Sequence, residues 1–459
     1  MAFASQKNLL RIFLLITLLT GALPAMAESQ FPLYPIIQAN VGFWEKIYGT
    51  YTTRQGILHD KENLDIIYAI VNLVDWNTPG AAKINKQLVK IARQRYKNIL
   101  STLASGAPPA SRDEKRISAL FKKYKHPSFH RARDNIRLQI GQKDRFLQGV
   151  IRSGAYLPAI KRILRAKGLP LELAYLPHVE SSFNPRAYSK VAAAGLWQFT
   201  RSTGRQYLTI NNVIDERLDV YLATRAAADF LKENHRQLGS WPLALTAYNY
   251  GRAGMVRAQQ QLGSYENIFT SHNSKLFRFA SRNFYSEFLA ALRVARKLEK
   301  DPTIIRDRPW ASTSLRLKGF AKASALRKYF GVSPQDFSHL NPALRPPVLK
   351  GKKYVPKGYL LRLPATKSIR KKISHLPASL FHHSQVRTIF HKVRRGDTVS
   401  SIARKYHISQ KELTRINHLN RKSAIRSGQK LRIPAHGNKR ISRHAKSIHT
   451  LKATAKRKP

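Results

Sequence analysis

The sequence predicts a mainly α protein that carries small mixed α/β modules near its C-terminus. Apolar residues recur at three- and four-residue spacing through much of residues 28–300, which is typical of helices that bury one face. Beyond Pro302 a strand–helix–helix–strand unit occurs twice, as a weak internal repeat. The chain of 459 residues is long enough for two to four domains.

Residues 28–130 are predicted to form an N-terminal helical region. Two of its segments have helical spacing of apolar residues, LDIIYAIVNLVDW at 64–76 and INKQLVKIARQRYKNILSTL at 84–103. The segment ASGAPPAS at 104–111 is rich in Pro, Gly and Ser, and it predicts a linker or a sharp turn.

Residues 131–300 are predicted to form a second, mostly helical domain. Its helices are separated by short breaker sequences, which are GLP at 168–170, FNP at 183–185, STG at 202–204 and GSWP at 239–242. No long alternating pattern typical of a strand interrupts this block.

The C-terminal part contains the two repeat units, predicted at residues 311–365 and 388–434. YFGVSPQDFSHLN at 329–341 matches YHISQKELTRIN at 406–417, and each is followed by a strand that ends at Pro, LRLP or LRIP. The first unit is the more degenerate. Residues 435–459 hold eight Lys and Arg and no acid, which predicts a disordered basic tail.

The charge balance is unusual, with 82 Lys and Arg against 25 Asp and Glu. Such an excess indicates an anionic partner surface, which could be nucleic acid, membrane headgroups or an acidic polymer; a merely solvated basic surface is the alternative. The chain has no Cys, which excludes disulfides, thiolate metal sites and Cys nucleophiles.

Residues 1–27 have the pattern of a cleavable secretory signal. A basic start precedes a short apolar run, and Ala-Met-Ala at 25–27 resembles a cleavage site. We therefore expect a periplasmic or cell-envelope location, and the secretory signal disfavours a specific nucleic-acid partner. An uncleaved anchor is the alternative. No Cys follows the signal, so we expect no lipid anchor, and no later segment has the ~20 apolar residues of a transmembrane helix.

One acid occupies an apolar stripe. Leu173, Leu176, Glu180 and Phe183 are spaced three, four and three apart, which places them on one helix face. Desolvation there would raise the pKa of the Glu180 carboxyl and suit it to general acid catalysis. Pro177 predicts a kinked or restarted helix beside it. The alternative is a Glu at the stripe's edge, with its carboxyl in water.

Two later motifs offer groups for a sugar ligand. In GLWQF at 195–199, Trp197 supplies an apolar plate and Gln198 an amide; the alternative is a core Trp beside a surface Gln. In LALTAYNYG at 243–251, Tyr248 and Asn249 lie near a helix end. They could reach a ligand, or they could serve as a core residue and part of a C-terminal cap.

In this order, Glu180-Ser181, GLWQ at 195–198 and Ala-Tyr-Asn at 247–249 resemble the lytic transglycosylase family related to goose-type lysozyme. The flanking sequences are most similar to its membrane-bound lytic murein transglycosylase D branch. The resemblance covers roughly residues 131–300, and the two C-terminal units resemble LysM modules.

The resemblance implies a lysozyme-like helical catalytic domain that acts on peptidoglycan, and LysM modules that bind glycans containing N-acetylglucosamine. It assigns the catalytic acid to Glu180 and substrate contacts to Ser189, Gln198, Tyr248 and Asn249. It implies no cofactor and no metal. Ala192 departs from the Gly that usually opens the small loop before GLWQ, so a positive φ at Ala192 would be strained. The missing lipid anchor is a second departure.

No acid lies between Glu180 and Asp215, which favours a single-carboxyl reaction. Glu180 would protonate the oxygen between N-acetylmuramic acid and N-acetylglucosamine, and would then take a proton from the sugar's 6-hydroxyl, giving a 1,6-anhydromuramyl end. The DERLD cluster at 215–219 is interpreted as a helix cap at Asp215 with Arg217 paired. Hydrolysis through Asp215 or Asp219 and a non-catalytic wall binder remain alternatives.

Overall fold

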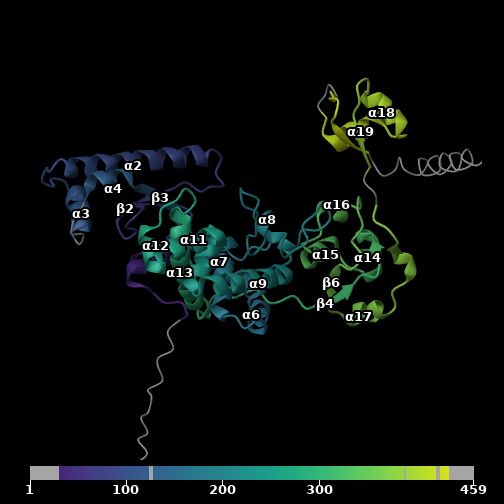
Figure 1. The fold of residues 1–459 in the computed structure, drawn as a ribbon, viewed down its shortest axis with the longest axis horizontal. Helices are drawn as coiled ribbons and strands as arrows, with labels where there is room; N and C mark the ends of the chain where they lie inside the picture. The colour runs from purple at the N-terminus through teal and green to yellow at the C-terminus, as the bar shows by residue number, and fades with distance from the viewer. Residues whose placement is uncertain (1–29, 123–127, 387–388, 420–423, 434–459) are drawn as a thin grey trace, which may run out of the picture. The chain divides into compact units, whose positions relative to one another are not determined.

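The structure is a computed structural model that describes residues 30–122, 128–386, 389–419 and 424–433 (Figure 1). The predicted signal at 1–27 and the predicted tail at 435–459 lie outside the described residues. The chain divides into two units, Met1–Gly141 with Phe230–Arg293, and Gln142–Asp229 with Val294–Pro459. Among the described helices, none combines the length and the apolar character needed to cross a bilayer.

The first unit combines helices with one small sheet. Its elements are η1 (Pro35–Ile37), α1 (Gln38–Gly49), β1 (Gln55–Asp60), β2 (Ile67–Asn72), α2 (Ala81–Ala104), α3 (Arg112–Phe121), α4 (Phe129–Asp134), β3 (Ile136–Ile140), α10 (Trp241–Tyr250), α11 (Arg252–Leu262), α12 (Tyr265–Ser271) and most of α13 (Phe279–Glu299).

The helix predicted within residues 64–76 is wrong, because this segment forms β2. The strand pairs antiparallel with β1, which also pairs with β3, giving the sheet order β2-β1-β3. β-branched residues such as Ile67, Ile70 and Val71 favour a pleated strand, and the pairing of this segment with residues 55–60 decides between helix and strand. The region predicted as purely helical is therefore mixed, and its sheet continues beyond residue 130.

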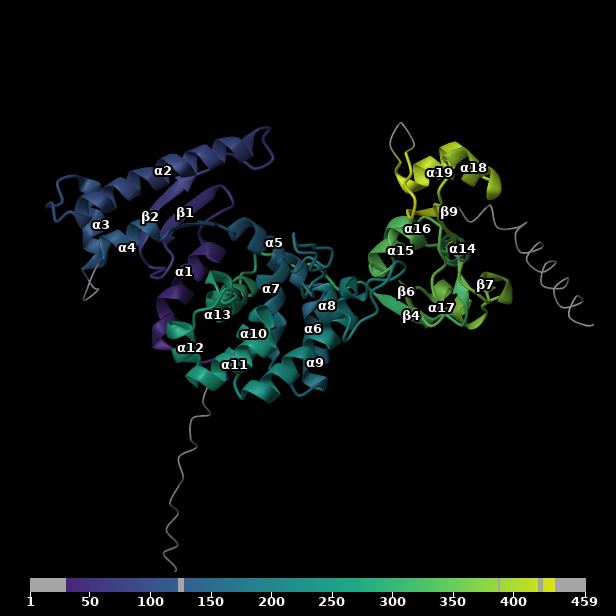
Figure 2. The same cartoon turned by 45° about the horizontal axis from the view of Figure 1, so that its top comes forward.

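The helix predicted from residues 84–103 is confirmed as α2. It contacts both β2 and β3 and closes a core over the sheet (Figures 1 and 2). Val89, Tyr96 and Leu100 of α2 are buried in that core against Leu58 and Tyr68 of the sheet. The turn predicted at 104–111 is also confirmed, because α2 ends at Ala104 and a capping box at Ser111 starts α3.

The second unit begins with short helices and ends with the repeat modules. Its elements are α5 (Lys143–Ser153), α6 (Leu157–Ala166), η2 (Leu171–Tyr175), α7 (Leu176–Ser181), α8 (Arg201–Gly204), η3 (Glu216–Leu218), the first half of α9 (Val220–Leu238), β4 (Ser312–Arg316), β5 (Phe320–Ala321), α14 (Ala323–Phe330), α15 (Pro334–Leu340), α16 (Pro346–Leu349), β6 (Leu360–Pro364), α17 (Lys367–Ser374), η4 (Ala378–Leu380), β7 (Phe381–His382), β8 (Ile389–Lys392), α18 (Val399–Lys405), α19 (Gln410–Asn417) and β9 (Lys430–Ile433). With helices dominating both units, the mainly α prediction is confirmed.

Both repeats have the predicted strand–helix–helix–strand order. In the first, β4 pairs antiparallel with β6, and in the second β8 pairs with β9. The Asn that ends each repeat explains why the pattern recurs. Asn341 accepts a hydrogen bond from the Arg362 backbone and donates to its carbonyl, and Asn417 makes the same two bonds to Arg432. Each Asn thus ties the second helix of its module to the closing strand.

The first module is joined to the helical part of its unit through a shared core. Ile214 and Leu344 form a β-bridge, the Asp215 backbone N–H donates to the Ala343 carbonyl, and Val213 packs with the module's apolar residues. The module also continues past residue 365, because β5 pairs with β7 at residues 381–382. Residues 311–382 therefore form an integral part of the second unit.

Candidate active site

The helix that carries Glu180 restarts at a proline, as the sequence predicts. η2 ends at Tyr175 and α7 begins at Leu176, with Pro177 in its first turn, where a missing N–H costs no helical hydrogen bond. Leu173 and Leu176 are fully buried, whereas Glu180 is half-buried. Glu180 thus lies where the buried stripe gives way to partly exposed residues.

The turn after Glu180 packs against α5. Ser182 and Phe183 both have positive φ, and Arg152 donates a 2.6 Å hydrogen bond from Nη2 to the Ser182 carbonyl oxygen. A Cβ atom on Gly149 would lie 2.9 Å from that same oxygen, so only glycine lets α5 approach this closely. This packing fixes the direction in which the chain leaves α7.

His178, two residues before Glu180, is a neutral core residue. Its ring packs against Phe146 and Phe183 with centroid separations of 4.9 and 4.4 Å, and its side chain is buried. Burial, reinforced by the charge of Arg152, lowers the pKa of His178 to about 3. The imidazole is therefore uncharged near neutral pH and supports the packing under α7 without exchanging protons there.

The loop between Phe183 and Phe199 is tied directly to α7. The Ser181 hydroxyl donates a 2.8 Å hydrogen bond to the Leu196 carbonyl oxygen, which explains why Glu-Ser and GLWQ occur together. Gly195 has a φ of 80°, and a Cβ atom there would lie 1.8 Å from the Arg217 carbonyl oxygen. No other residue type fits this position.

Ser189 and Gln198 both lie on this loop. Ser189 is exposed, and its hydroxyl accepts a 3.0 Å hydrogen bond from the Ala193 N–H across a tight turn. Gln198 is half-buried with a φ of 48°, and its Nε2 donates a 2.7 Å bond to the Gly195 carbonyl oxygen. The loop thus presents a hydroxyl and an amide after Glu180.

Trp197 is a core residue, and its interpretation as a sugar-binding plate is wrong. The side chain is fully buried, and its indole N–H donates a 2.9 Å hydrogen bond to the Thr224 hydroxyl of α9. An indole whose donor is satisfied inside the protein anchors the loop to α9.

Arg217 holds the loop at two points from inside the protein. Its guanidinium donates to the Ala192 and Phe199 carbonyl oxygens at 2.8 and 2.9 Å, and it forms a two-bond ion pair with Asp215 at 2.9 and 2.8 Å. Arg217 and Asp215 are each 1% exposed. The sequence predicts the pairing of Arg217, but its contacts with the loop carbonyls have no sequence signal.

Asp215 occupies the N-cap position of η3, as predicted, but its side chain makes no capping hydrogen bond there. The side-chain cap in this cluster belongs to Asp219. Asp219 Oδ1 accepts hydrogen bonds from the Tyr221 and Leu222 N–H groups at the start of α9. Its carboxylate also pairs with Arg362 of the first module and is 2% exposed. Neither Asp215 nor Asp219 is therefore available to activate a water molecule in this arrangement.

Tyr248 and Asn249 lie in α10 of the first unit. Gly251 ends that helix with a φ of 99°, so the capping interpretation holds for the end of this motif. Asn249 is exposed and its Oδ1 accepts a 2.8 Å hydrogen bond from the Ser281 hydroxyl, and Tyr248 packs against Phe230 at 5.3 Å. Their placement toward Glu180 stays a prediction.

The strain predicted at Ala192 is present, because Ala192 has a φ of 60°. A Cβ in this region costs roughly 1–2 kcal/mol. Ala192→Gly is expected to raise the free energy of unfolding by up to about 1 kcal/mol, since the gain is partly offset by the greater freedom of Gly in the unfolded chain. Denaturant titration checks this. Ala194→Gly, at a buried position, should lower stability instead; equal losses in both variants would contradict the strain at Ala192.

Among the residues that the structure describes, no group of three or more His, Asp or Glu could hold a metal ion. The site thus combines one half-buried carboxyl in α7 with a loop that is bonded to α7 and to Arg217 and that carries polar side chains. This arrangement suits general acid–base catalysis on a bound polymer.

Comparison with known proteins agrees with the motif resemblance. Residues 158–268 match the transglycosylase SLT domain, and residues 391–434 match the LysM domain. The chain is 26% identical over 333 residues to membrane-bound lytic murein transglycosylase D of Escherichia coli strain K12, covering 70% of this chain and 73% of that protein. The predicted resemblance is thereby confirmed, and the second predicted repeat is a LysM domain.

Two further proteins are similar to parts of the chain. A putative tributyltin chloride resistance protein of Alteromonas sp. strain M-1 is 38% identical over 109 residues, covering 23% of this chain and 53% of that protein. The crystal structure of the 70 kDa soluble lytic transglycosylase of Escherichia coli is similar with a TM-score of 0.27 and 20% identity, covering 33% of this chain and 26% of that one.

Proposed function

We propose that the protein is a peptidoglycan lytic transglycosylase, which cleaves the β-1,4 bond between N-acetylmuramic acid and N-acetylglucosamine without using water. The observation that carries the proposal is the contrast between three carboxyls. Glu180 is half-buried in α7, whereas Asp215 and Asp219 are buried in ion pairs. The matched SLT domain and the lytic transglycosylase relative support the same activity.

Glu180 acts first as an acid and then as a base. It donates a proton to the oxygen that leaves with N-acetylglucosamine, and the glycosidic bond breaks. The substrate's N-acetyl group stabilises the positive charge at the anomeric carbon, as in substrate-assisted glycosidases. Glu180, now ionised, removes the proton of the 6-hydroxyl, whose oxygen bonds to the anomeric carbon. The 1,6-anhydro ring forms and the carboxyl regains its proton, so the reaction needs no second carboxyl.

The loop and α10 supply the binding groups in this scheme. Ser189 and Gln198 hydrogen-bond the glycan next to Glu180, and Tyr248 and Asn249 orient the N-acetyl group. Correct orientation of the 6-hydroxyl toward the anomeric carbon accounts for much of the rate, because the attack is intramolecular.

Hydrolysis is the second candidate and is disfavoured by the same contrast. A hydrolase would need Asp215 or Asp219 to activate water, and this would require breaking a buried ion pair and leaving an arginine without its countercharge. A non-catalytic wall binder is the third candidate, and turnover of purified peptidoglycan separates it from both enzymes.

The LysM domain anchors the enzyme to the wall through N-acetylglucosamine-containing glycan, and the basic C-terminal region adds attraction to anionic wall polymers. We place the enzyme in the periplasm or cell envelope, after removal of the secretory signal and without a lipid anchor. The sequence pattern of residues 1–27 and the murein relative support this location.

The products of digestion test the proposal. Purified sacculi incubated with the protein should release muropeptides with 1,6-anhydro ends, each lighter by one water than a hydrolysis product. Mass spectrometry distinguishes the two, and a digest with the Glu180→Gln variant provides the blank. Free reducing ends alone would establish the hydrolase, and the absence of any product would leave the wall binder.

A further inference from the structure

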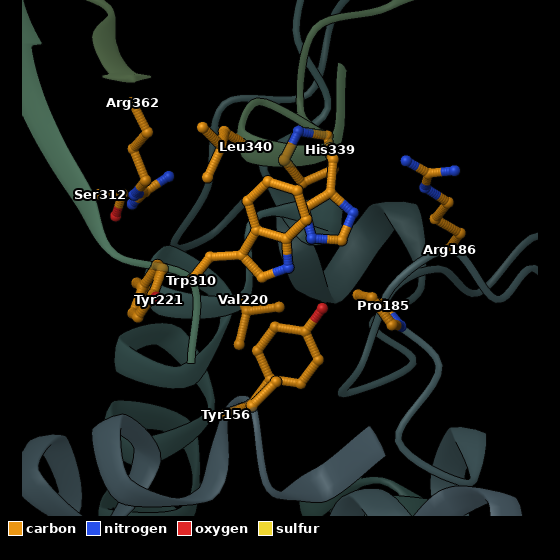
Figure 3. A pocket seen from close by; sticks show the side chains of 12 residues that line it. Tyr156, Pro185, Arg186, Val220, Tyr221, Trp310, Ser312, His339, Leu340 and Arg362 are labelled. Atoms are coloured by element: carbon orange, nitrogen blue, oxygen red, sulfur yellow. The ribbon is translucent and has the colours of Figure 1, made fainter. Parts of the chain in front are cut away.

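A pocket lies where the first repeat module meets the helical part of the second unit. Figure 3 shows it between the α5–α6 turn, the loop after Glu180, the start of α9 and the module itself. Twelve residues line it, of which Tyr156, Arg186, Tyr221, Trp310, His339 and Arg362 carry the argument. No residue placed in the catalytic scheme belongs to it.

The floor of the pocket is aromatic. Trp310 is a large apolar side chain that is 49% exposed, and its indole packs against the His339 ring with a centroid separation of 4.4 Å. The Tyr156 ring stands next to the indole, and its hydroxyl points toward the pocket (Figure 3). An exposed indole beside a second ring, within a concave surface, is the surface on which proteins stack the apolar face of a sugar.

The rim of the pocket carries polar side chains. Arg186 is exposed, Tyr156 is half-buried, and both line the pocket. Burial and the nearby charge of Arg186 lower the pKa of His339, which leaves its ring neutral and able to donate and accept. None of the twelve lining residues is acidic.

The far wall is rigid. Arg362 of β6 pairs with the buried Asp219, and its guanidinium lies 4.6 Å from the Tyr221 ring centroid. This ion pair and the backbone bonds between residues 213–215 and 343–345 fix the module against the helices. The pocket is therefore built before any ligand arrives, which lowers the entropic cost of binding.

We propose that this pocket is a second glycan-binding site, which stacks one N-acetylated sugar of the peptidoglycan strand on Trp310 and hydrogen-bonds it through Tyr156, Arg186 and His339. The inference rests on the proposed function, because it takes the same polymer as its ligand. The first module thereby contributes to binding through its junction with the catalytic unit. Arg186 lies on the same loop as Ser189 and Gln198, the residues proposed to contact the substrate.

Binding of N-acetylchitotetraose to the full chain tests this site, with every protein in a Glu180→Gln background so that no turnover occurs. Isothermal titration should show one of two differences between the proteins. Either Trp310→Ala has one binding site fewer than the parent, or its affinity at that site is at least tenfold weaker. Ile305→Ala, which removes an 86% exposed side chain five residues earlier, should bind like the parent. The LysM domain is present in all proteins and contributes equally.

A second pair of variants guards against a structural effect of the tryptophan change. Arg186→Gln should weaken the same site, whereas Arg308→Gln, at an exposed position outside the pocket, should not. Tyr156→Phe keeps the ring and removes only the hydroxyl, and should weaken binding with an unchanged melting temperature.

The outcomes are distinct from those of the product test. Binding that is unchanged in all three pocket variants would overturn the inference while leaving the catalytic proposal intact. A pocket-dependent affinity for an acidic stem peptide without sugar, together with unaltered binding of the chitotetraose, would overturn it in favour of a peptide site. Loss of the chitotetraose site only in the pocket variants supports it, whatever the products of digestion.

Discussion

Glu180→Gln is expected to keep the fold and to lose nearly all turnover on sacculi. The amide has almost the same shape and volume as the carboxyl, and the position is only half-buried, so the change should disturb the packing little. General acid–base catalysis contributes about 10²–10⁴-fold for each role, and the proposed mechanism gives Glu180 both roles, acid and base. The loss should therefore exceed that of any single binding residue of the loop.

A matched control is available eight residues earlier. Glu172→Gln makes the same chemical change at the start of η2, where the carboxylate forms a partly exposed 2.7 Å ion pair with Arg296. This variant should retain close to full activity, because an exposed ion pair contributes little. Rates of anhydro-muropeptide release and melting temperatures are measured for both. A Glu180→Gln protein with even a tenth of the parent rate would remove Glu180 from the mechanism.

The catalytic helix and the repeat modules could be predicted because their signals are local. Pro177 can only begin or kink a helix, and the Asn at the end of each repeat makes the same bonds to a strand of its own module. The order of Glu180, GLWQ and Ala-Tyr-Asn along the chain carries the resemblance to lytic transglycosylases, and recognising it requires no knowledge of which residues are in contact. These features each depend on residues within about one module of sequence.

The remaining features depend on contacts that no short segment contains. β2 has apolar residues that fit either a helix or a strand, and its strand partner at residues 55–60 decides the outcome. The sequence around Trp197 fits either a ligand-facing or a buried side chain. The hydrogen bond from its indole to Thr224, a residue of another segment, belongs to the buried arrangement. Asp219 and Arg362 are 143 residues apart, so neither the buried pair nor the junction pocket has a sequence signature.

Arg217→Ala is expected to destabilise the second unit strongly. Removing the guanidinium leaves the Asp215 carboxylate buried without its partner, and it leaves the Ala192 and Phe199 carbonyls without their donor. Breaking a buried ion pair by deleting one partner costs about 3–5 kcal/mol. Denaturant titration should show a loss of this size, and Arg205→Ala, at an exposed neighbouring position, should show almost none.

Stability and activity measurements on Asp215→Asn distinguish a structural role of Asp215 from a catalytic one. Asp215→Asn removes the countercharge of Arg217 but keeps the shape of the pair, so it should lower stability and loosen the loop that carries Gln198. Activity should then fall in proportion to the folded fraction and recover at lower temperature, with anhydro ends unchanged. A catalytic Asp215 would behave in the opposite way, with full stability and no turnover at any temperature. Because the carboxylate is 1% exposed and already accepts two guanidinium bonds, the first outcome is the one that the structure supports.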